Sequence, residues 1–128
     1  MTLSLTHTNL VNDFKHLLAL TSHTRNLRNL QPYQVHSMLQ RLVRMRAIDY
    51  DYDSMAEYSV RVGGQVGYID VMWAAYDTPV VAIEIDSSYR KKSVEKLLAV
   101  NAPIKVWIYY GDFDGYFPDD IIVVRGSV

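Results

Sequence analysis

The sequence predicts a single α/β domain in which helices flank a mixed central sheet. Three observations lead to this prediction. The chain has 128 residues, a length that suits one hydrophobic core. Apolar residues recur at helical spacing in its first third and alternate with polar residues, as in strands, from residue 57 onward. A helical segment then separates the third and fourth expected strands, so these two strands should run parallel.

Two helices are expected before the first strand. Asn12 or Thr8 would cap the first, which buries a run of leucines. Pro32 suits the first turn of the second helix, which should continue to about Ala47. Residues 1–32 would thus form an N-terminal helical extension of the single domain. Three polar residues of the second helix are expected to face the solvent: Gln40, Arg41 and Arg44.

Three strands should follow an acidic, tyrosine-rich turn at residues 49–54. Residues 57–62 alternate between polar and apolar types, which indicates a half-buried strand. The glycines at residues 63–64 turn the chain into a second strand over residues 66–75. A short turn leads into the third strand at residues 80–86, so the second and third strands should be antiparallel neighbours.

The last part of the chain contains one more helix and two more strands. The helix is expected over residues 89–100, with Ser87 or Ser88 as its N-cap. Strands at residues 105–110 and 121–124 enclose an acidic, aromatic loop. The helix is expected to bury Val94, Leu97 and Leu98 and to place Lys92 and Lys96 on the far side.

Composition excludes several classes of function. The chain has no cysteine, which rules out disulfides, cysteine-bound zinc and thiol nucleophiles. It has no apolar run near the ~20 residues that span a bilayer, and its N-terminus lacks the order of a secretory signal. We therefore expect a cytoplasmic protein with no membrane association.

The net charge of −1 is unevenly distributed. Residues 14–48 contain no acidic side chain. The cationic residues of this stretch are Lys15, Arg25, Arg28, Arg41, Arg44 and Arg46. Such a stretch is typical of a surface that meets phosphate, but a solvated cationic helix face would have the same composition.

Acidic residues interrupt two strands that are otherwise apolar. Glu84 and Asp86 share one face of the third strand, and Asp70 lies within an apolar run of the second. If the short turn joins these strands, Asp70 lies near the other two. Carboxylates held together in a low dielectric repel one another, and a hard divalent cation such as magnesium or manganese would relieve that repulsion.

Two structural interpretations compete with a metal site. Asp70 and Glu84 could pair with a buried arginine, with Arg61 and Arg90 as the candidates. Asp86 could simply end its strand and help to cap the following helix.

The sequence resembles the PD-(D/E)XK, or restriction-endonuclease-like, superfamily, whose core has the order αβββαβ. The resemblance covers residues 33–110 and rests on Tyr68-Ile-Asp70, on Val81-Ala-Ile-Glu84-Ile-Asp86 and on the basic helix after them. It implies that Asp70, Glu84 and the carbonyl of Ile85 bind Mg²⁺ or Mn²⁺. The implied activity is endonucleolytic hydrolysis of DNA phosphodiesters.

Asp86 stands where that family has its lysine, which assists the attacking water. The carboxylate could itself act as base or ligand, the lysine could have moved to the next helix, or catalysis could be lost. For a moved lysine, Lys91 is the first choice, with Lys92 and Lys96 behind it. A solvated helix face would explain all three lysines equally well.

The function predicted from these residues is a metal-dependent DNA endonuclease, and a homodimer is expected because two strands are to be cut. The alternative is a catalytically inactive module of the same fold that binds nucleic acid or a protein. Expected nucleic-acid contacts are Arg41, Arg44, Lys92 and Lys96. The histidines are expected to be surface or packing residues: His7, His16, His23 and His36.

Overall fold

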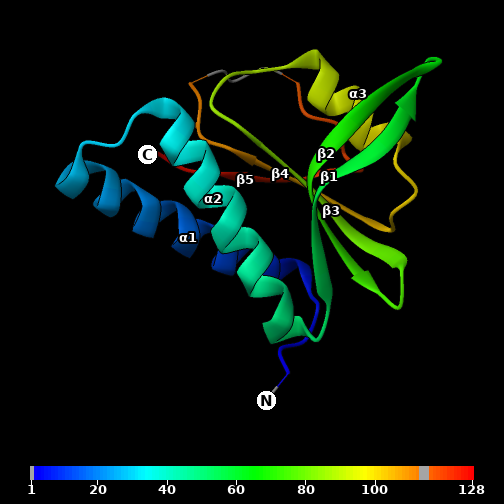
Figure 1. Ribbon diagram of the computed structural model, residues 1–128, viewed down its shortest axis with the longest axis horizontal. Helices are drawn as coiled ribbons and strands as arrows, with labels where there is room; N and C mark the ends of the chain where they lie inside the picture. Colours follow the sequence, from blue (N-terminus) through cyan, green and yellow to red (C-terminus); the bar gives the residue numbers. More distant parts are fainter. Residues whose placement is uncertain (1, 113–115) are drawn as a thin grey trace.

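Five strands form one mixed sheet, and helices cover both of its faces (Figure 1). The computed structural model describes residues 2–112 and 116–128. Its helices are α1 (His7–Arg28), α2 (Pro32–Arg46) and α3 (Lys91–Ala99), with a short 3-10 helix, η1 (Ala47–Tyr50), after α2. Its strands are β1 (Asp53–Val62), β2 (Gln65–Ala75), β3 (Thr78–Asp86), β4 (Ile104–Tyr109) and β5 (Ile122–Arg125). The predicted α/β class with a mixed sheet is confirmed.

The strands lie in the sheet in the order in which they occur in the sequence. β1, β2 and β3 form an antiparallel meander, whereas β4 and β5 are parallel to β3. Gly63 and Gly64 make the first turn with φ angles of 53° and 84°, which suit glycine. The predicted hairpins and the parallel pair on either side of α3 are confirmed, and β3 is the central strand.

α1 and α2 pack on one face of the sheet around Trp73. The Trp73 ring is fully buried and lies edge-on to Phe14 at 5.6 Å between centroids. Its indole N–H donates a hydrogen bond to the carbonyl of Val43 at 3.1 Å. Truncating a buried tryptophan typically costs about 3–5 kcal/mol. This ring therefore fixes α2 against β2.

α3 packs on the opposite face, against Trp107 and neighbouring residues of β2 and β3. Leu97 and Ser93 are its buried side chains. Along β3, Val81, Ile83 and Ile85 belong to the core under α1 and α2. The alternate residues of β3 face α3, as their spacing predicts.

The helix starts differ from those expected. α1 begins earlier, because Thr6 rather than Thr8 or Asn12 is its N-cap and accepts a hydrogen bond from the Asn9 N–H at 3.1 Å. α3 begins only at Lys91, and its N-cap, Arg90, makes no capping bond through its side chain. Ser87 and Ser88 were expected as caps, but they precede Arg90 in an irregular segment.

Two further predictions differ from the structure, the start of β1 and the burial of Leu98. β1 begins at Asp53, within the segment predicted as an acidic turn, because Asp53 and Ser54 pair with the far end of β2. Leu98 was expected in the apolar stripe of α3 but is 46% exposed. Residues 113–115, part of the predicted acidic, aromatic loop, lie outside the described residues.

Candidate functional site

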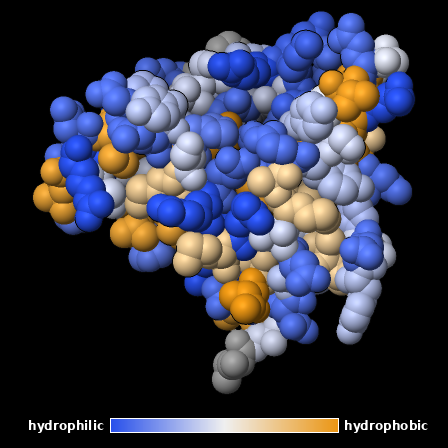
Figure 2. Space-filling model, in the orientation of Figure 1, coloured by the Kyte–Doolittle hydropathy of each residue, from blue (hydrophilic) through white to orange (hydrophobic). Residues whose placement is uncertain are grey.

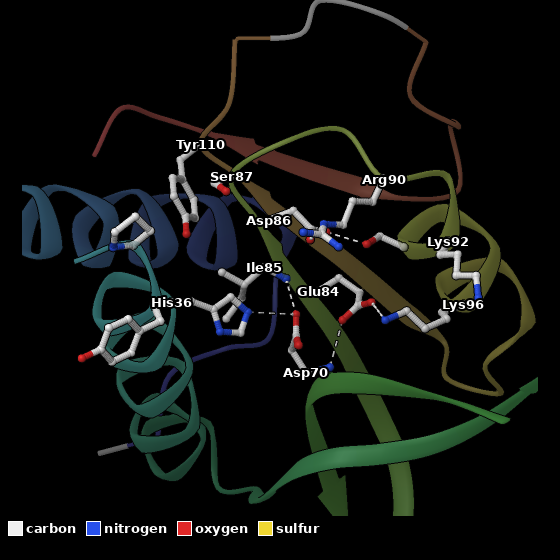
Figure 3. Close-up of a pocket in the computed structure, with 13 residues that line it drawn as sticks. His36, Asp70, Glu84, Ile85, Asp86, Ser87, Arg90, Lys92, Lys96 and Tyr110 are labelled. Atoms are coloured by element: carbon white, nitrogen blue, oxygen red, sulfur yellow. Dashed lines mark hydrogen bonds and ion pairs between the residues drawn. The ribbon is translucent and has the colours of Figure 1, made fainter. Parts of the chain in front are cut away.

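The candidate site forms where β2 and β3 separate. The antiparallel ladder between these strands ends at the pair Val71 and Ile83. One residue further, the Asp70 N–H donates to Glu84 Oε2 at 2.9 Å, and the Ile85 N–H donates to Asp70 Oδ2 at 2.8 Å (Figure 3). Each carboxylate thus accepts a hydrogen bond from a backbone N–H of the other strand. The predicted proximity of Asp70 and Glu84 is confirmed.

Glu84 is the most deeply buried ionisable group of this site, with only 1% of its surface exposed. Its Oε1 atom forms an ion pair with the ammonium of Lys96. Within the described part of the chain, Oε1 has no hydrogen-bond partner of suitable geometry, so this contact is an ion pair and not a directed hydrogen bond. A divalent cation at this oxygen would therefore have to displace the Lys96 ammonium.

Lys96 lies at the site, although the helix pattern placed it on the far side of α3. Its ammonium is held by Glu84 and by a hydrogen bond of 2.8 Å to the carbonyl of Tyr68. Its aliphatic chain crosses Gly67, where an added Cβ would lie 3.0 Å from Lys96 Cδ. A lysine on a helix surface reaches the buried carboxylate because Gly67 leaves room for its stem.

The pKa values of the two carboxyl groups are shifted in opposite directions. Burial, followed by the charge of Asp70 and a hydrogen bond with it, raises the pKa of Glu84, and Lys96 only partly opposes this. Burial would also raise the pKa of Asp70, but hydrogen bonds from its neighbours lower it below its usual value. Glu84 is therefore the carboxyl group of the pair that takes up a proton more readily when no cation is bound.

His36 approaches Asp70 from α2. Its Nε2 lies 3.6 Å from Asp70 Oδ2, and it lines the same pocket (Figure 3). The neighbouring Asp70 carboxylate raises the pKa of His36, against the opposing effect of burial. His36 is thus a partly exposed residue that contacts the carboxylate pair, a contact that the sequence did not predict.

Gln40 lies one turn after His36 and also contacts the site. Its side-chain amide donates to the carbonyl of Asp70 at 2.9 Å and to Glu57 Oε1 at 3.2 Å. The prediction that Gln40 faces the solvent is wrong. A signal was present in the sequence, because His36 and Gln40 are spaced i, i+4 beside the apolar stripe of α2 and so share one face.

Asp86 joins β3 to α3 and β4. Its Oδ2 accepts hydrogen bonds from Trp107 Nε1 at 2.8 Å and from Ser93 Oγ at 2.5 Å. Arg90 Nε lies 3.5 Å from its Oδ1. Burial raises the pKa of Asp86, and these hydrogen bonds oppose the rise. Asp86 holds the start of α3 through Ser93 and Arg90 rather than through a backbone cap.

The salt-bridge interpretation finds only partial support. Arg90 pairs with Asp86 and not with the predicted pair of carboxylates. The cationic partners of Asp70 and Glu84 are His36 and Lys96.

A pocket of about 470 Å³ opens above these residues. His36 lines the pocket from α2, and Arg90, Lys92 and Lys96 line it from α3 and the segment before α3 (Figure 3). Lys91 and Arg44 are exposed and do not line this pocket. Arg41 instead lines a separate groove between α1 and α2.

The donor set suits a hard divalent cation. In residues 2–112 and 116–128, no cluster of three or more acidic or histidine side chains has the geometry to hold a metal ion. The pair of carboxylates nevertheless offers oxygen ligands, and a cation at Glu84 Oε1 would take the place of the Lys96 ammonium. Mg²⁺ and Mn²⁺ prefer oxygen ligands and retain several waters, so two carboxylates suffice.

No family model matches this chain, and comparisons with curated proteins and with solved structures gave no significant match. In the part of the chain described, no helix has the length and apolar character needed to cross a bilayer. The fold and the site thus define an α/β domain with a carboxylate pair in a pocket that both acidic and cationic side chains line.

Proposed function

We propose that this chain is a metal-dependent nuclease of the restriction-endonuclease-like type that hydrolyses DNA phosphodiesters. The proposal depends on one observation. Asp70 and Glu84 interlock at the fork between β2 and β3, and Lys96 contacts the buried carboxylate at the floor of an open pocket. Paired carboxylates with an adjacent cation suit phosphoryl chemistry, in which negative charge builds up on the reacting group.

Each residue of the pair has a distinct role in this proposal. Asp70, Glu84 and the carbonyl of Ile85 would hold Mg²⁺ or Mn²⁺. When bound, such an ion activates a water molecule and offsets charge on the scissile phosphate. His36 and Gln40 orient Asp70 through its carboxylate and its carbonyl, respectively.

Lys96 takes the role for which Lys91 was the first choice. Its ammonium is next to Glu84 and reaches the pocket, whereas Lys91 is exposed outside it. In this position Lys96 can orient the attacking water or bind a phosphate oxygen. Arg90 and Lys92 line the same pocket and supply further positive charge for the substrate backbone.

The second candidate is a module of the same fold that binds nucleic acid without cutting it. Two observations favour it. Lys96 contacts the same Glu84 oxygen that a metal would need, so it competes with the cation. Asp86, at the position of the family's lysine, is engaged in structural hydrogen bonds.

A cleavage assay separates the two candidates. Supercoiled plasmid, branched DNA and single-stranded DNA are incubated with the protein in Mg²⁺, Mn²⁺ or EDTA. The nuclease proposal expects metal-dependent cutting that falls at least about 100-fold in Asp70→Asn and Glu84→Gln, since both remove a ligand. Asp77→Asn is the matched control, because Asp77 is exposed at the turn of the same hairpin.

Two outcomes of the assay and one separate measurement of mass are informative. Cutting that survives in both ligand variants, with circular dichroism unchanged, contradicts the proposal. Binding of DNA without any cutting by the wild type supports the inactive module. A dimer that cuts both strands of a duplex would show a doubled mass by light scattering under the assay conditions.

A further inference from the structure

A second groove lies beside the carboxylate pocket, between α1 and α2. It has a volume of about 440 Å³ and is lined by the last turns of α1, the connection and the first half of α2. Leu30 and Met38 supply apolar surface to it. The function proposed for the carboxylate pocket gives this groove no role.

Tyr33 connects the groove to the carboxylate pocket. This residue lines both hollows, and 71% of its surface is exposed. An exposed aromatic ring between two hollows provides a flat surface on which a planar group can stack.

The groove is cationic. Arg28 and Arg41 line it from the two helices, and no acidic residue does so. Among the residues that the structure describes, neither arginine has an ion-pair partner. α2 contains no acidic residue, and the one acidic residue of α1, Asp13, pairs with Arg46. The guanidinium groups are therefore available to an anionic ligand.

The space-filling view agrees with a ligand that is both charged and partly apolar. Much of the face that carries α2 is hydrophilic, and hydrophobic side chains gather at the end of the helical layer where α1 turns into α2 (Figure 2). A ligand for this region needs anionic groups for the arginines and a flat surface for Tyr33.

We propose that the groove between α1 and α2 binds single-stranded DNA and guides it toward the carboxylate pocket. Tyr33 stacks on a base, and Arg28 and Arg41 contact phosphates on either side of it. An unpaired base is required, because the bases of a duplex are stacked on one another and their faces are not available to Tyr33. The inference rests on the proposed function, since it names the strand that the pocket would cut.

The test measures binding apart from cutting. Fluorescence anisotropy of labelled oligothymidylate and of a duplex of equal length is recorded in EDTA over a range of salt concentrations. Tyr33→Ala should weaken single-strand binding about fivefold or more, while Tyr33→Phe retains it, because stacking on one base contributes roughly 1–3 kcal/mol.

The arginines are tested through salt dependence. The double variant Arg28→Ala/Arg41→Ala should reduce the slope of log affinity against log salt by about 1.4, since each phosphate contact on a single strand contributes about 0.7. Lys15→Ala is the control, because Lys15 is an exposed cation of α1 that does not line the groove. Circular dichroism checks that each variant is folded.

Two results would overturn the inference. One is that Tyr33→Ala and the double arginine variant bind single-stranded DNA as tightly as Lys15→Ala does. The other is an equal loss of duplex binding, which would assign the groove to the backbone of any DNA.

Failure of the proposed function is recognised separately. If the wild type never cuts DNA but the groove variants lose single-strand binding, the groove assignment stands and the nuclease proposal fails. If Asp70→Asn abolishes cutting while the groove variants bind as the wild type does, only the groove assignment fails.

Discussion

The aliphatic chain of Lys96 lies against Gly67, so that a Cβ at position 67 would come within 3.0 Å of Lys96 Cδ and 3.3 Å of Lys96 Cγ. This contact is what lets a lysine of α3 reach a carboxylate in the middle of the sheet. A side chain at position 67 would occupy the path of the Lys96 stem.

Gly67→Val is therefore expected to displace Lys96 while leaving the sheet intact, since valine suits strands and Gly67 lies at a β1–β2 pair with Val60. DNA cleavage should fall by about tenfold or more if Lys96 assists the reaction, as loss of a supporting interaction commonly does. The control is Ser59→Val, at an exposed position of the neighbouring strand β1, with thermal unfolding measured for both variants. Cleavage at the wild-type rate by a folded Gly67→Val would show that the Lys96 position is unimportant.

Lys96→Met should separate two effects of the ammonium. Because Lys96 pairs with the Glu84 oxygen that is otherwise unbonded, its removal should tighten Mn²⁺ binding. It should at the same time reduce cleavage, because the water loses an orienting cation. Lys91→Met serves as the control on the same helix, with titration calorimetry for Mn²⁺ and a plasmid assay for cutting. Weaker Mn²⁺ binding in Lys96→Met would contradict competition between ammonium and metal.

Gln40→Ala removes the bridge between Asp70 and Glu57. Loss of such hydrogen bonds should lower the free energy of unfolding by about 1 kcal/mol, and poorer orientation of Asp70 should weaken Mn²⁺ binding about tenfold. Ser37→Ala is a control at an exposed position of the same helix, and denaturant unfolding gives the stability of both variants. A Gln40→Ala protein that loses stability but keeps full Mn²⁺ affinity would limit Gln40 to a structural role.

Stability should depend on pH through Glu84 when the protein is kept in EDTA. Its pKa in the folded state is raised above its ordinary value of 4.5, so the folded state keeps a proton that the unfolded chain has lost. The stabilisation is complete below pH 4.5 and is lost as pH rises toward the folded-state pKa. Glu84→Gln cannot titrate, so its stability should fall less steeply over this range.

The difference in slope between wild type and Glu84→Gln should approach about 1.4 kcal/mol per pH unit, the value for one proton. Urea unfolding from pH 5 to pH 8 measures it. Parallel stability curves for the two proteins would show that Glu84 is already ionised in the folded state.

The sequence was sufficient to predict the sheet and the pair of carboxylates. Alternation along β3 placed Glu84 and Asp86 on one face of the strand, and the short turn after β2 placed Asp70 near them. These predictions succeeded because they depend on the two-residue period of strands and on chain connectivity, both of which are local.

The residues around the pair could not be assigned in the same way. A helix wheel places Lys96 in solvent, and only the contact with Gly67 of a distant strand shows where its flexible chain goes. His36 and Gln40 contact Asp70 because Trp73 fixes α2 on the sheet, a packing relationship that no local pattern contains.

The predictions of the helix N-caps failed for a similar reason. Several serines and threonines could cap α1 or α3, and the choice depends on how the preceding chain enters each helix. Thr6 caps α1. The N-cap of α3 is Arg90, and both its guanidinium and the Ser93 hydroxyl contact Asp86.

The most direct test of the metal site is a crystal soaked in a manganese salt, with anomalous scattering recorded at the manganese edge. The account predicts an anomalous peak within ligand distance of Asp70 and Glu84, with the Lys96 ammonium moved away from Glu84 Oε1. The contradictory result is a crystal saturated with Mn²⁺ in which the peak is absent from this pocket and the Lys96 ammonium still contacts Glu84.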